Sequence, residues 1–427
     1  MKRTDDFLGE HRLKASDIDM ENLVEVFIKD MIDGLSGKEG TLRMIPTYIE
    51  AENDFLTEVP VLAIDAGGTN FRASVVKFSG TGQIESGEII SYRMPGLKKE
   101  VSAKEFFSII AGYIKPLADR SQRIGFCFSY PTEILPNRDG RLIQFCKEVQ
   151  APEVVGQLIG KNLLETLGTP EKKLVILNDT VATLLAGKSE SFNRSYDTFI
   201  GYILGTGTNT CYIESNSNIT KNKDLDRERS QIINIESGNF KRGPRTDLDI
   251  VFDNSTIDPG NYTFEKMFSG GYFGGLCLTV LKSAAIEGVF SRKSGEKLAE
   301  LVRLSSNEAN NFVINPYSHN NILNNCLKDK RDIESASEII NSLIERAAKL
   351  VAANLIAVVL RTGKGKSPDR PVLITVEGTA FYKLNNLKTG FEELFNSYLS
   401  GDNKRYVEFT RVDQSGLRGA ALAALID

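Results

Sequence analysis

Apolar and polar positions alternate along the chain in a way that predicts both strands and helices. Short apolar runs bounded by glycine, proline or polar residues are typical of buried strands, whereas apolar residues at three- and four-residue spacing are typical of amphipathic helices. The predicted strands are 61–64, 71–76, 88–93, 123–128, 174–177, 198–204 and 210–213. The predicted helices are 17–35, 103–117, 333–360 and 415–426. Strands followed by a helix and then further strands indicate an α/β protein with a mixed sheet.

The first strand pair turns on two adjacent glycines, Gly67 and Gly68. Glycine takes positive φ without a Cβ clash, and successive N–H groups in such a turn form a concave anion site. Thr69 and Asn70 add donors, and Arg72 adds a positive charge suited to phosphate. Asp65, just before the turn, would repel a phosphate unless a cation lay between them. The stretch therefore predicts a Mg²⁺–nucleotide site, although a plain hairpin remains possible on these residues alone.

A second unit of the same kind turns at Gly205, Thr206 and Gly207, with apolar strands on both sides. Two hairpins with glycine flanked by threonine and asparagine favour a duplicated nucleotide-binding half over two unrelated hairpins. Each half would hold a different phosphate.

Polar residues also follow two of the predicted strands. Ser129 comes after the strand 123–128, and Asn178 and Asp179 come after the strand 174–177. Ligands of open α/β sheets bind at the carboxyl ends of strands, so these residues are candidates for a site. Capping of the following helix by Asp179 or Thr180 is the simpler explanation when the segment is taken alone.

Composition narrows the possible functions. The chain has 427 residues, enough for about two to three domains, and a net charge of −4 that gives no long-range attraction to nucleic acid or an anionic membrane. The first residues lack the apolar core of a signal peptide, and the longest apolar runs are too short to span a membrane. Five scattered cysteines without framework spacing favour reduced thiols, and we expect a cytoplasmic protein. The two histidines, His11 and His319, are expected at the surface.

Nine segments in a fixed order carry a resemblance to a known family. They are LSGKEGTLRMIPTYI (35–49), LAIDAGGTNFR (62–72), GFCFSYP (125–131), LNDTVATLLAG (177–187), GYILGTGTNTCYIE (201–214), INIESGNF (233–240), DPGNYTFEKMFSGGYFGGL (258–276), ITVEGTAFYKL (374–384) and SGLRGAAL (415–422). Together they strongly resemble the hexokinases of the eukaryotic, glucokinase-like type, within the actin-like ATPase superfamily. The resemblance covers most of the chain from about residue 23.

That resemblance implies an α/β, two-domain actin-like ATPase (ribonuclease H-like) fold with mixed sheets and an interdomain cleft. The small domain would comprise residues 58–179 plus 410–427, and the large domain residues 1–57 plus 180–409. The implied reaction is transfer of the γ-phosphoryl group of ATP to the 6-hydroxyl of a hexose, most simply glucose, with Mg²⁺ entering as Mg-ATP. The implied partners are hexose and ATP, with no nucleic acid or membrane, in a monomer or homodimer.

The resemblance also assigns roles to individual residues. Asp179 matches the catalytic base that accepts the proton of the sugar hydroxyl, and Asp65 matches a carboxylate that lies near Mg²⁺, possibly through water. The sugar-binding positions are Ser129, Lys147, Asn178, Asn209, Glu236 and Glu265. The nucleotide-binding positions are Asp65, Gly67, Gly68, Thr69, Asn70, Arg72, Gly205, Thr206, Gly207, Gly378 and Thr379. Taken singly, Glu236 is equally well a surface strand residue, and Glu265 an exposed helix residue paired with Lys266.

Four positions depart from the family pattern. Cys146 replaces a threonine before the sugar-binding lysine, Ser237 replaces a tryptophan, Tyr262 replaces a glutamine, and Gly275 replaces a glutamate. These changes leave open which hexose is preferred: mannose, fructose or an amino sugar are alternatives to glucose. A non-catalytic sugar sensor is the competing hypothesis of another class. A bacterial-type repressor/kinase is weaker, because its cysteine-rich zinc cluster is missing.

Overall fold

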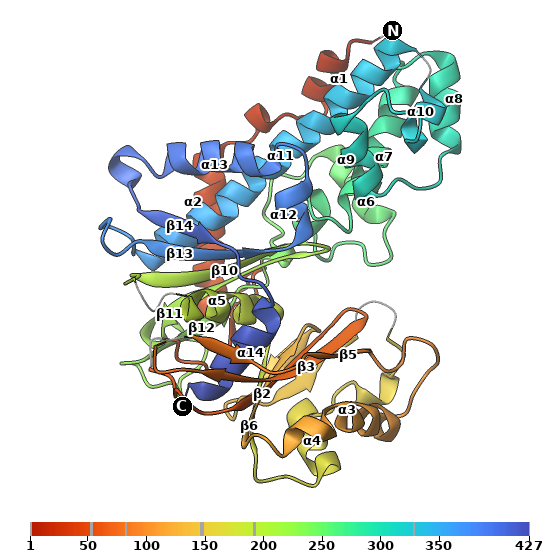
Figure 1. Ribbon diagram of the computed structural model, residues 1–427. Helices are drawn as coiled ribbons and strands as arrows, with labels where there is room; N and C mark the ends of the chain where they lie inside the picture. Colours follow the sequence, from red (N-terminus) through yellow and green to blue (C-terminus); the bar gives the residue numbers. More distant parts are fainter. Residues whose placement is uncertain are drawn as a thin grey trace.

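The computed structural model describes residues 2–51, 54–81, 83–145, 149–190, 194–327 and 329–426. Two β-sheets lie one above the other in Figure 1, with two helices, α5 and α14, between them. Both sheets contain parallel and antiparallel strand pairs, so the predicted α/β fold with mixed sheets is confirmed.

The sheet of the lower lobe is built on the first glycine hairpin. Its strand order is β4(Ile84–Ser86)–β3(Asn70–Phe78)–β2(Val61–Gly67)–β6(Arg123–Phe128)–β9(Lys173–Leu177), and β5(Ile90–Arg93) also pairs with β3. A separate small hairpin comprises β7(Thr132–Ile134) and β8(Gly140–Leu142). The strand predicted at 88–93 is therefore wrong at its start, because a break follows β4 and pairing with β3 resumes only at Ile90.

The sheet of the upper lobe is built on the second glycine hairpin. Its order is β1(Ile45–Pro46)–β12(Ser230–Asn234)–β11(Thr208–Ser215)–β10(Thr198–Leu204)–β13(Val372–Glu377)–β14(Val407–Thr410). In each sheet the strand before the glycine turn (β2 or β10) pairs antiparallel with the strand after it (β3 or β11) and parallel with a later strand (β6 or β13). That later strand pairs parallel with the last strand of the sheet in chain order (β9 or β14). The duplication predicted from the two glycine turns is thus confirmed by topology.

The last strand of each sheet in chain order leads into one of the two central helices. β9 continues directly into α5(Asp179–Ser189), and α14(Ser415–Leu425) follows β14. Strand side chains alternate between faces, so Val61 and Ala63 of β2 join the apolar cluster around α5 and α14, while Leu62 and Ile64 join the cluster on the other face. Small residues let these layers approach closely: a Cβ added at Gly125 of β6 would lie 1.8 Å from the Ala420 carbonyl oxygen of α14.

The far face of the lower sheet is covered by α3(Ala103–Ala118) and α4(Ile159–Leu167), and α3 confirms the amphipathic helix predicted there. The other helices belong to the upper lobe. They are α1(Thr4–Glu10), α2(Met20–Ser36), α6(Asp247–Asn254), α7(Phe273–Ile286), α8(Arg292–Glu300), α9(Ser306–Ile314), α10(Ile322–Cys326), α11(Lys330–Thr362), α12(Thr379–Lys383) and α13(Leu387–Tyr398).

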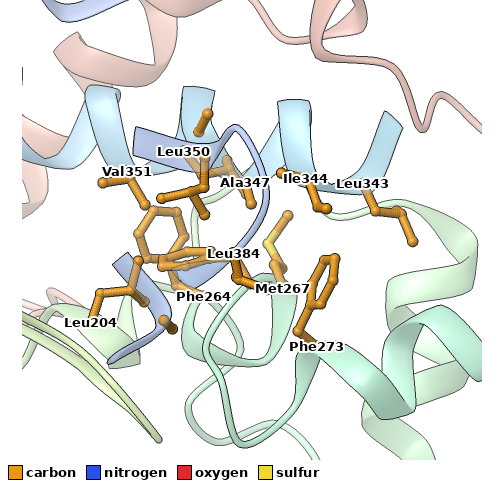
Figure 2. Close-up of a cluster of buried hydrophobic side chains, with 14 of the residues drawn as sticks. Leu204, Phe264, Met267, Phe273, Leu343, Ile344, Ala347, Leu350, Val351 and Leu384 are labelled. Carbon is orange, nitrogen blue, oxygen red and sulfur yellow. The ribbon is translucent and has the colours of Figure 1, made fainter. Parts of the chain in front are cut away.

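The long helix α11 organises the core of the upper lobe. Figure 2 shows Leu343, Ala347 and Leu350 directed from this helix toward the aromatic rings and leucines of neighbouring segments. The helix predicted at 333–360 is confirmed and extends further at both ends. The helix predicted at 17–35 is α2, which begins at Met20; Asp19 is its N-cap, with a side chain that accepts a hydrogen bond from the Asn22 amide. Among the described residues, no helix is long and apolar enough to cross a membrane.

Candidate active site

The first glycine hairpin presents a charged pair at the end of its strands. Asp65 on β2 lies opposite Arg72 on β3, and Nη2 of Arg72 lies 2.5 Å from Oδ2 of Asp65. The carboxylate is almost buried, whereas the guanidinium is 44% exposed and can reach a ligand. The N-terminus of α14 covers Asp65 from the other side, since a Cβ on Gly416 would lie 2.7 Å from the carboxyl group. The turn between the strands contains Gly68, with a φ of 61°.

The second glycine turn packs against two further backbone segments. The Gly205 and Thr206 carbonyl oxygens accept hydrogen bonds from the Gly270 and Gly271 amides, each at 2.8 Å. Gly378 has a φ of 109° and lies so close to the Leu204 carbonyl that a Cβ there would come within 2.2 Å. Glycine is therefore required at this contact for both conformation and space.

The first glycine hairpin opens onto a cavity between the sheets, with a volume of about 520 Å³, and the second hairpin contributes Ile203 of β10 to its wall. Among its lining residues are five of the eleven predicted nucleotide positions, together with Ser129 and Asp179 from the predicted sugar side. The cavity is lined by Asp65, Gly67, Asn70, Arg72, Ser91, Ser129, Asp179, Thr183, Ile203, Glu377, Gly378, Ser415 and Gly416. Three further predicted nucleotide positions are exposed in or beside the glycine turns: Thr69, Thr206 and Thr379. Gly205 packs against Gly378. The predicted interdomain cleft thus exists, with the first glycine turn, Gly378 and Asp179 on its walls.

Asp179 is the first residue of α5 and does not cap it. Asn178 is the N-cap, and its Oδ1 accepts a hydrogen bond from the Thr180 amide at 2.9 Å. The capping alternative placed at Asp179 or Thr180 is therefore wrong by one or two residues. Because Asn178 caps the helix, the Asp179 carboxylate projects from the first turn into the cavity. One of its oxygens also accepts from the Thr180 amide at 2.9 Å.

A cluster of amides and one carboxylate lies beside Asp179. Asn209 on β11 donates to Asn234 at 2.8 Å, to Glu236 at 3.3 Å and to Asn178 at 3.5 Å. Asn234 in turn donates to Glu236 at 2.8 Å. Burial raises the pKa of Glu236, while the Asn234 hydrogen bond acts in the opposite direction. Carboxylate and amide groups that converge in this way can exchange their mutual hydrogen bonds for those of a hydroxylated ring.

Glu265 lies on the far side of this cluster, beneath the second glycine turn. Its Oε2 accepts a hydrogen bond from the Thr208 amide at 2.8 Å, and a Cβ on Gly207 would lie 2.6 Å from the same oxygen. Burial raises the pKa of Glu265 to about 7; the Thr208 hydrogen bond opposes this shift and the negative charge of Glu236 adds to it. The exposed pairing of Glu265 with Lys266 considered above is wrong, because Lys266 is 2% exposed and binds other acids.

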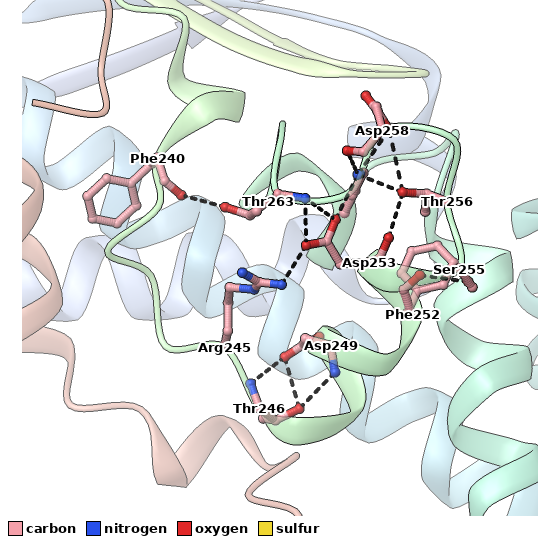
Figure 3. Close-up of polar contacts among 12 residues, drawn as sticks. Phe240, Arg245, Thr246, Asp249, Phe252, Asp253, Ser255, Thr256, Asp258 and Thr263 are labelled. Atoms are coloured by element: carbon pink, nitrogen blue, oxygen red, sulfur yellow. Dashed lines mark hydrogen bonds and ion pairs between the residues drawn. The ribbon is translucent and has the colours of Figure 1, made fainter.

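The segment that carries Glu265 is fixed by a buried ionic network. Nζ of Lys266 lies 2.8 Å from Asp253 and 3.0 Å from Asp258, and Arg245 lies 2.7 Å from Asp253. Figure 3 shows Asp253 and Asp258 from the end of α6 and the following loop directed toward the same region. The next turn of α6 is held by Asp249, which closes a capping box with Thr246 and forms a bidentate ion pair with Arg346.

The positions that depart from the family pattern have structural neighbours of their own. Ser237 is fully buried, and its hydroxyl lies 3.1 Å from that of Thr210, which accepts from Asn354 of α11 at 2.8 Å. A side chain at Gly275 would meet the Phe252 ring, with Cβ 2.7 Å from a ring carbon. Tyr262 has a φ of 51° in the loop before Glu265. Lys147, with Cys146, lies outside the described residues.

Some residues of this site were not predicted. Asn234 bridges Asn209 and Glu236, yet it ends an apolar strand and gave no signal beyond the INIE segment itself. Ser415, Gly416 and Glu377 line the cavity from segments that the resemblance included without assigning them roles. His11, expected at the surface, is instead 15% exposed and lies 2.7 Å from both Asp247 and Glu287.

Two duplicated sheets around a cleft, with a phosphate-type glycine turn in each half and a carboxylate between them, define a two-lobed ATP-dependent phosphotransferase of the actin-like fold. Hexokinase family models match residues 6–189 and 199–426, so the chain belongs to the hexokinase family, whose members phosphorylate hexoses with ATP. It is 27% identical to Hexokinase-1 of Schizosaccharomyces pombe over 95% of this chain and 87% of that protein. It is 28% identical to the glucokinase of Aspergillus niger over 94% of this chain and 92% of that protein.

Solved structures agree with this fold. The hexokinase of Schistosoma mansoni complexed with glucose superposes with a TM-score of 0.79, covering 99% of this chain and 98% of that one at 24% identity. Another hexokinase crystal structure superposes with a TM-score of 0.81, covering 98% of each chain at 22% identity.

Proposed function

We propose that this hexose kinase transfers the γ-phosphoryl group of ATP to the 6-hydroxyl of glucose, with Asp179 as the base. The observation that carries the proposal is the position of Asp179: it lines the same cavity as the first glycine turn and Arg72, and it adjoins the Asn178–Asn209–Glu236 cluster. A hydroxyl bound at that cluster would lie between the carboxylate and the phosphates.

Phosphoryl transfer requires that the protein position the two substrates and stabilise the charge on the transferring group. Asp179 accepts the proton of the attacking hydroxyl, which a carboxylate within hydrogen-bond reach can do. Arg72 and the amide groups of the glycine turns stabilise negative charge on the transferring group. Mg²⁺ bound to ATP neutralises charge on the phosphates. Oxygen ligands suit this ion, and Asp65 is the cavity carboxylate that we expect near it, directly or through water.

The remaining predicted residues divide between the two substrates. Ser129, Asn178, Asn209, Glu236 and Glu265, with Lys147 outside the described residues, are the proposed sugar ligands. The proposed phosphate and adenosine ligands are Gly67, Gly68, Thr69, Asn70, Arg72, Gly205, Thr206, Gly207, Gly378 and Thr379. We also propose that the small domain, residues 58–179 with 410–427, closes on the rest of the chain when sugar binds and excludes water from the γ-phosphate.

A coupled assay of ADP formation tests the reaction with glucose, mannose, fructose and glucosamine. We expect turnover that requires both sugar and Mg-ATP, and a loss of about 10²- to 10⁴-fold in kcat for Asp179→Ala, the usual contribution of a positioned base. Asp402→Ala, at an exposed aspartate on the upper lobe, is the control and should retain wild-type activity. Full activity in Asp179→Ala would refute the assignment, and sugar binding without turnover of any of the four sugars would support the sensor hypothesis.

Compartment and assembly are secondary parts of the proposal. The four cysteines within the described residues are free and buried, which supports a reducing, cytoplasmic setting. We propose a monomer or homodimer, to be distinguished by sedimentation.

A further inference from the structure

Tyr130 is held rigidly immediately after the strand end that carries Ser129. Its side chain is 2% exposed. The ring packs against Phe128 at a centroid distance of 4.9 Å and edge-on against Phe145 at 5.0 Å. Backbone pairing fixes the segment as well, because the Ser129 amide donates to the Ala66 carbonyl at 3.0 Å. The position of the Tyr130 hydroxyl is therefore determined by packing on several sides.

That hydroxyl donates a hydrogen bond of 2.8 Å to the Gly68 carbonyl, in the turn of the first glycine hairpin. The turn has two central residues, since Gly67 pairs with Asn70, and only the first of them, Gly68, has positive φ. This is the pattern of a type II′ hairpin turn. Its central peptide joins Gly68 to Thr69, and a glycine at the first position leaves that peptide unusually free to rotate.

A planar trans peptide directs its C=O and N–H groups to opposite sides. A hydrogen bond that fixes the Gly68 carbonyl on the Tyr130 side therefore fixes the Thr69 N–H on the other side of the turn. The next carbonyl, of Thr69, is held separately by the Met94 amide at 3.1 Å. Both carbonyls of the turn thus have protein partners outside it, and the orientation of its central amide depends on Tyr130.

We propose that Tyr130 is a positioning residue for the nucleotide: its hydroxyl sets the Gly68–Thr69 peptide so that the Thr69 N–H is directed at a phosphate of ATP. The inference rests on the proposed function of this turn. Tyr130 also lines a second, narrower cavity with Asn178 and Glu236 on the sugar side. The Tyr130 side chain therefore contacts both the proposed sugar side and the first glycine turn, and the hydrogen bond to Gly68 lies on the side of the turn.

The variant Tyr130→Phe removes the hydroxyl that makes this hydrogen bond and keeps the ring. We expect the KM for ATP and the dissociation constant for Mg-ADP to rise about 3- to 10-fold, the usual effect of one hydrogen bond, with the KM for sugar unchanged within about twofold. Tyr113→Phe is the matched control. Its hydroxyl also donates to a backbone carbonyl of the same lobe, that of Arg93 at 3.2 Å, but its ring packs against Phe71 and Tyr92.

Thermal melting of the ligand-free variants checks folding, and the shift in melting temperature with Mg-ADP reports nucleotide binding without turnover. Equal ATP and ADP parameters in Tyr130→Phe and wild type would overturn the inference, as would a rise in sugar KM as large as that for ATP. A wild-type protein that binds Mg-ADP yet phosphorylates no sugar would defeat the proposed function alone, because the ADP titration would still decide the role of Tyr130.

Discussion

Glu265 should make the stability of the ligand-free protein depend on pH in a way that a glutamine does not. Its pKa is raised from 4.5 to about 7, chiefly by burial under the second glycine turn. Between these values the folded chain retains a proton that the unfolded chain has released. Stability therefore falls as pH rises through this range and levels off above about pH 7. A pKa change of about 2.5 corresponds to about 3 kcal/mol, and we expect about 2–3 kcal/mol after solvent screening of this partly buried residue.

Glu265→Gln resembles the protonated form in shape and can still accept the hydrogen bond of the Thr208 amide. Urea unfolding at pH 5, 6, 7 and 8 should give similar free energies for variant and wild type at pH 5 and a more stable variant at pH 8. Glu296→Gln, at an exposed residue of α8 that pairs with Arg292, is the control and should give a difference independent of pH. A wild-type-minus-Glu265→Gln difference that is flat, or that favours wild type as pH rises, would contradict the reasoning.

Two further predictions concern buried polar contacts. Thr210→Val removes the hydroxyl that lies between Ser237 and Asn354, so we expect a loss of about 1–3 kcal/mol in the free energy of unfolding. We also expect a higher KM for sugar, because Thr210 adjoins Asn209. An unchanged melting temperature would contradict a stabilising role for these hydrogen bonds. Arg346→Met leaves Asp249 buried without its bidentate partner and should cost about 3–5 kcal/mol, measured by urea unfolding, whereas a loss below about 1 kcal/mol would argue that the pair contributes little.

Much of the framework could be predicted from local sequence because each signal was unambiguous. The strands 123–128 and 198–204 agree with the structure at both ends, since each is a buried apolar run bounded by polar or glycine residues. The duplication was predicted from two glycine turns with apolar strands on both sides, and the matching strand pairing of the two sheets agrees with it. The first of these turns also indicated several residues that line the cavity, and their roles in binding and catalysis remain predictions.

The remaining features depend on contacts that local sequence does not encode. Asn178, Asp179 and Thr180 are all capable of capping, and only the path of β9 into α5 selects Asn178. The asparagine-rich stretch 305–332 is not among the predicted helices, yet α9 and α10 form there. Lys266 appeared to be a surface partner of its neighbour Glu265, whereas its ion pairs are with acids 8 and 13 residues away.

The placement of α14 has a consequence for how the protein is made. Residues 415–425 are synthesised after the strands of both sheets, yet they pack in the layer between the two sheets and bring Gly416 against Asp65. A nascent chain that still lacks this segment leaves an apolar face on β2 and β6 uncovered and has no α14 beside Asp65. The cavity wall at Asp65 is therefore completed only after synthesis has passed this helix.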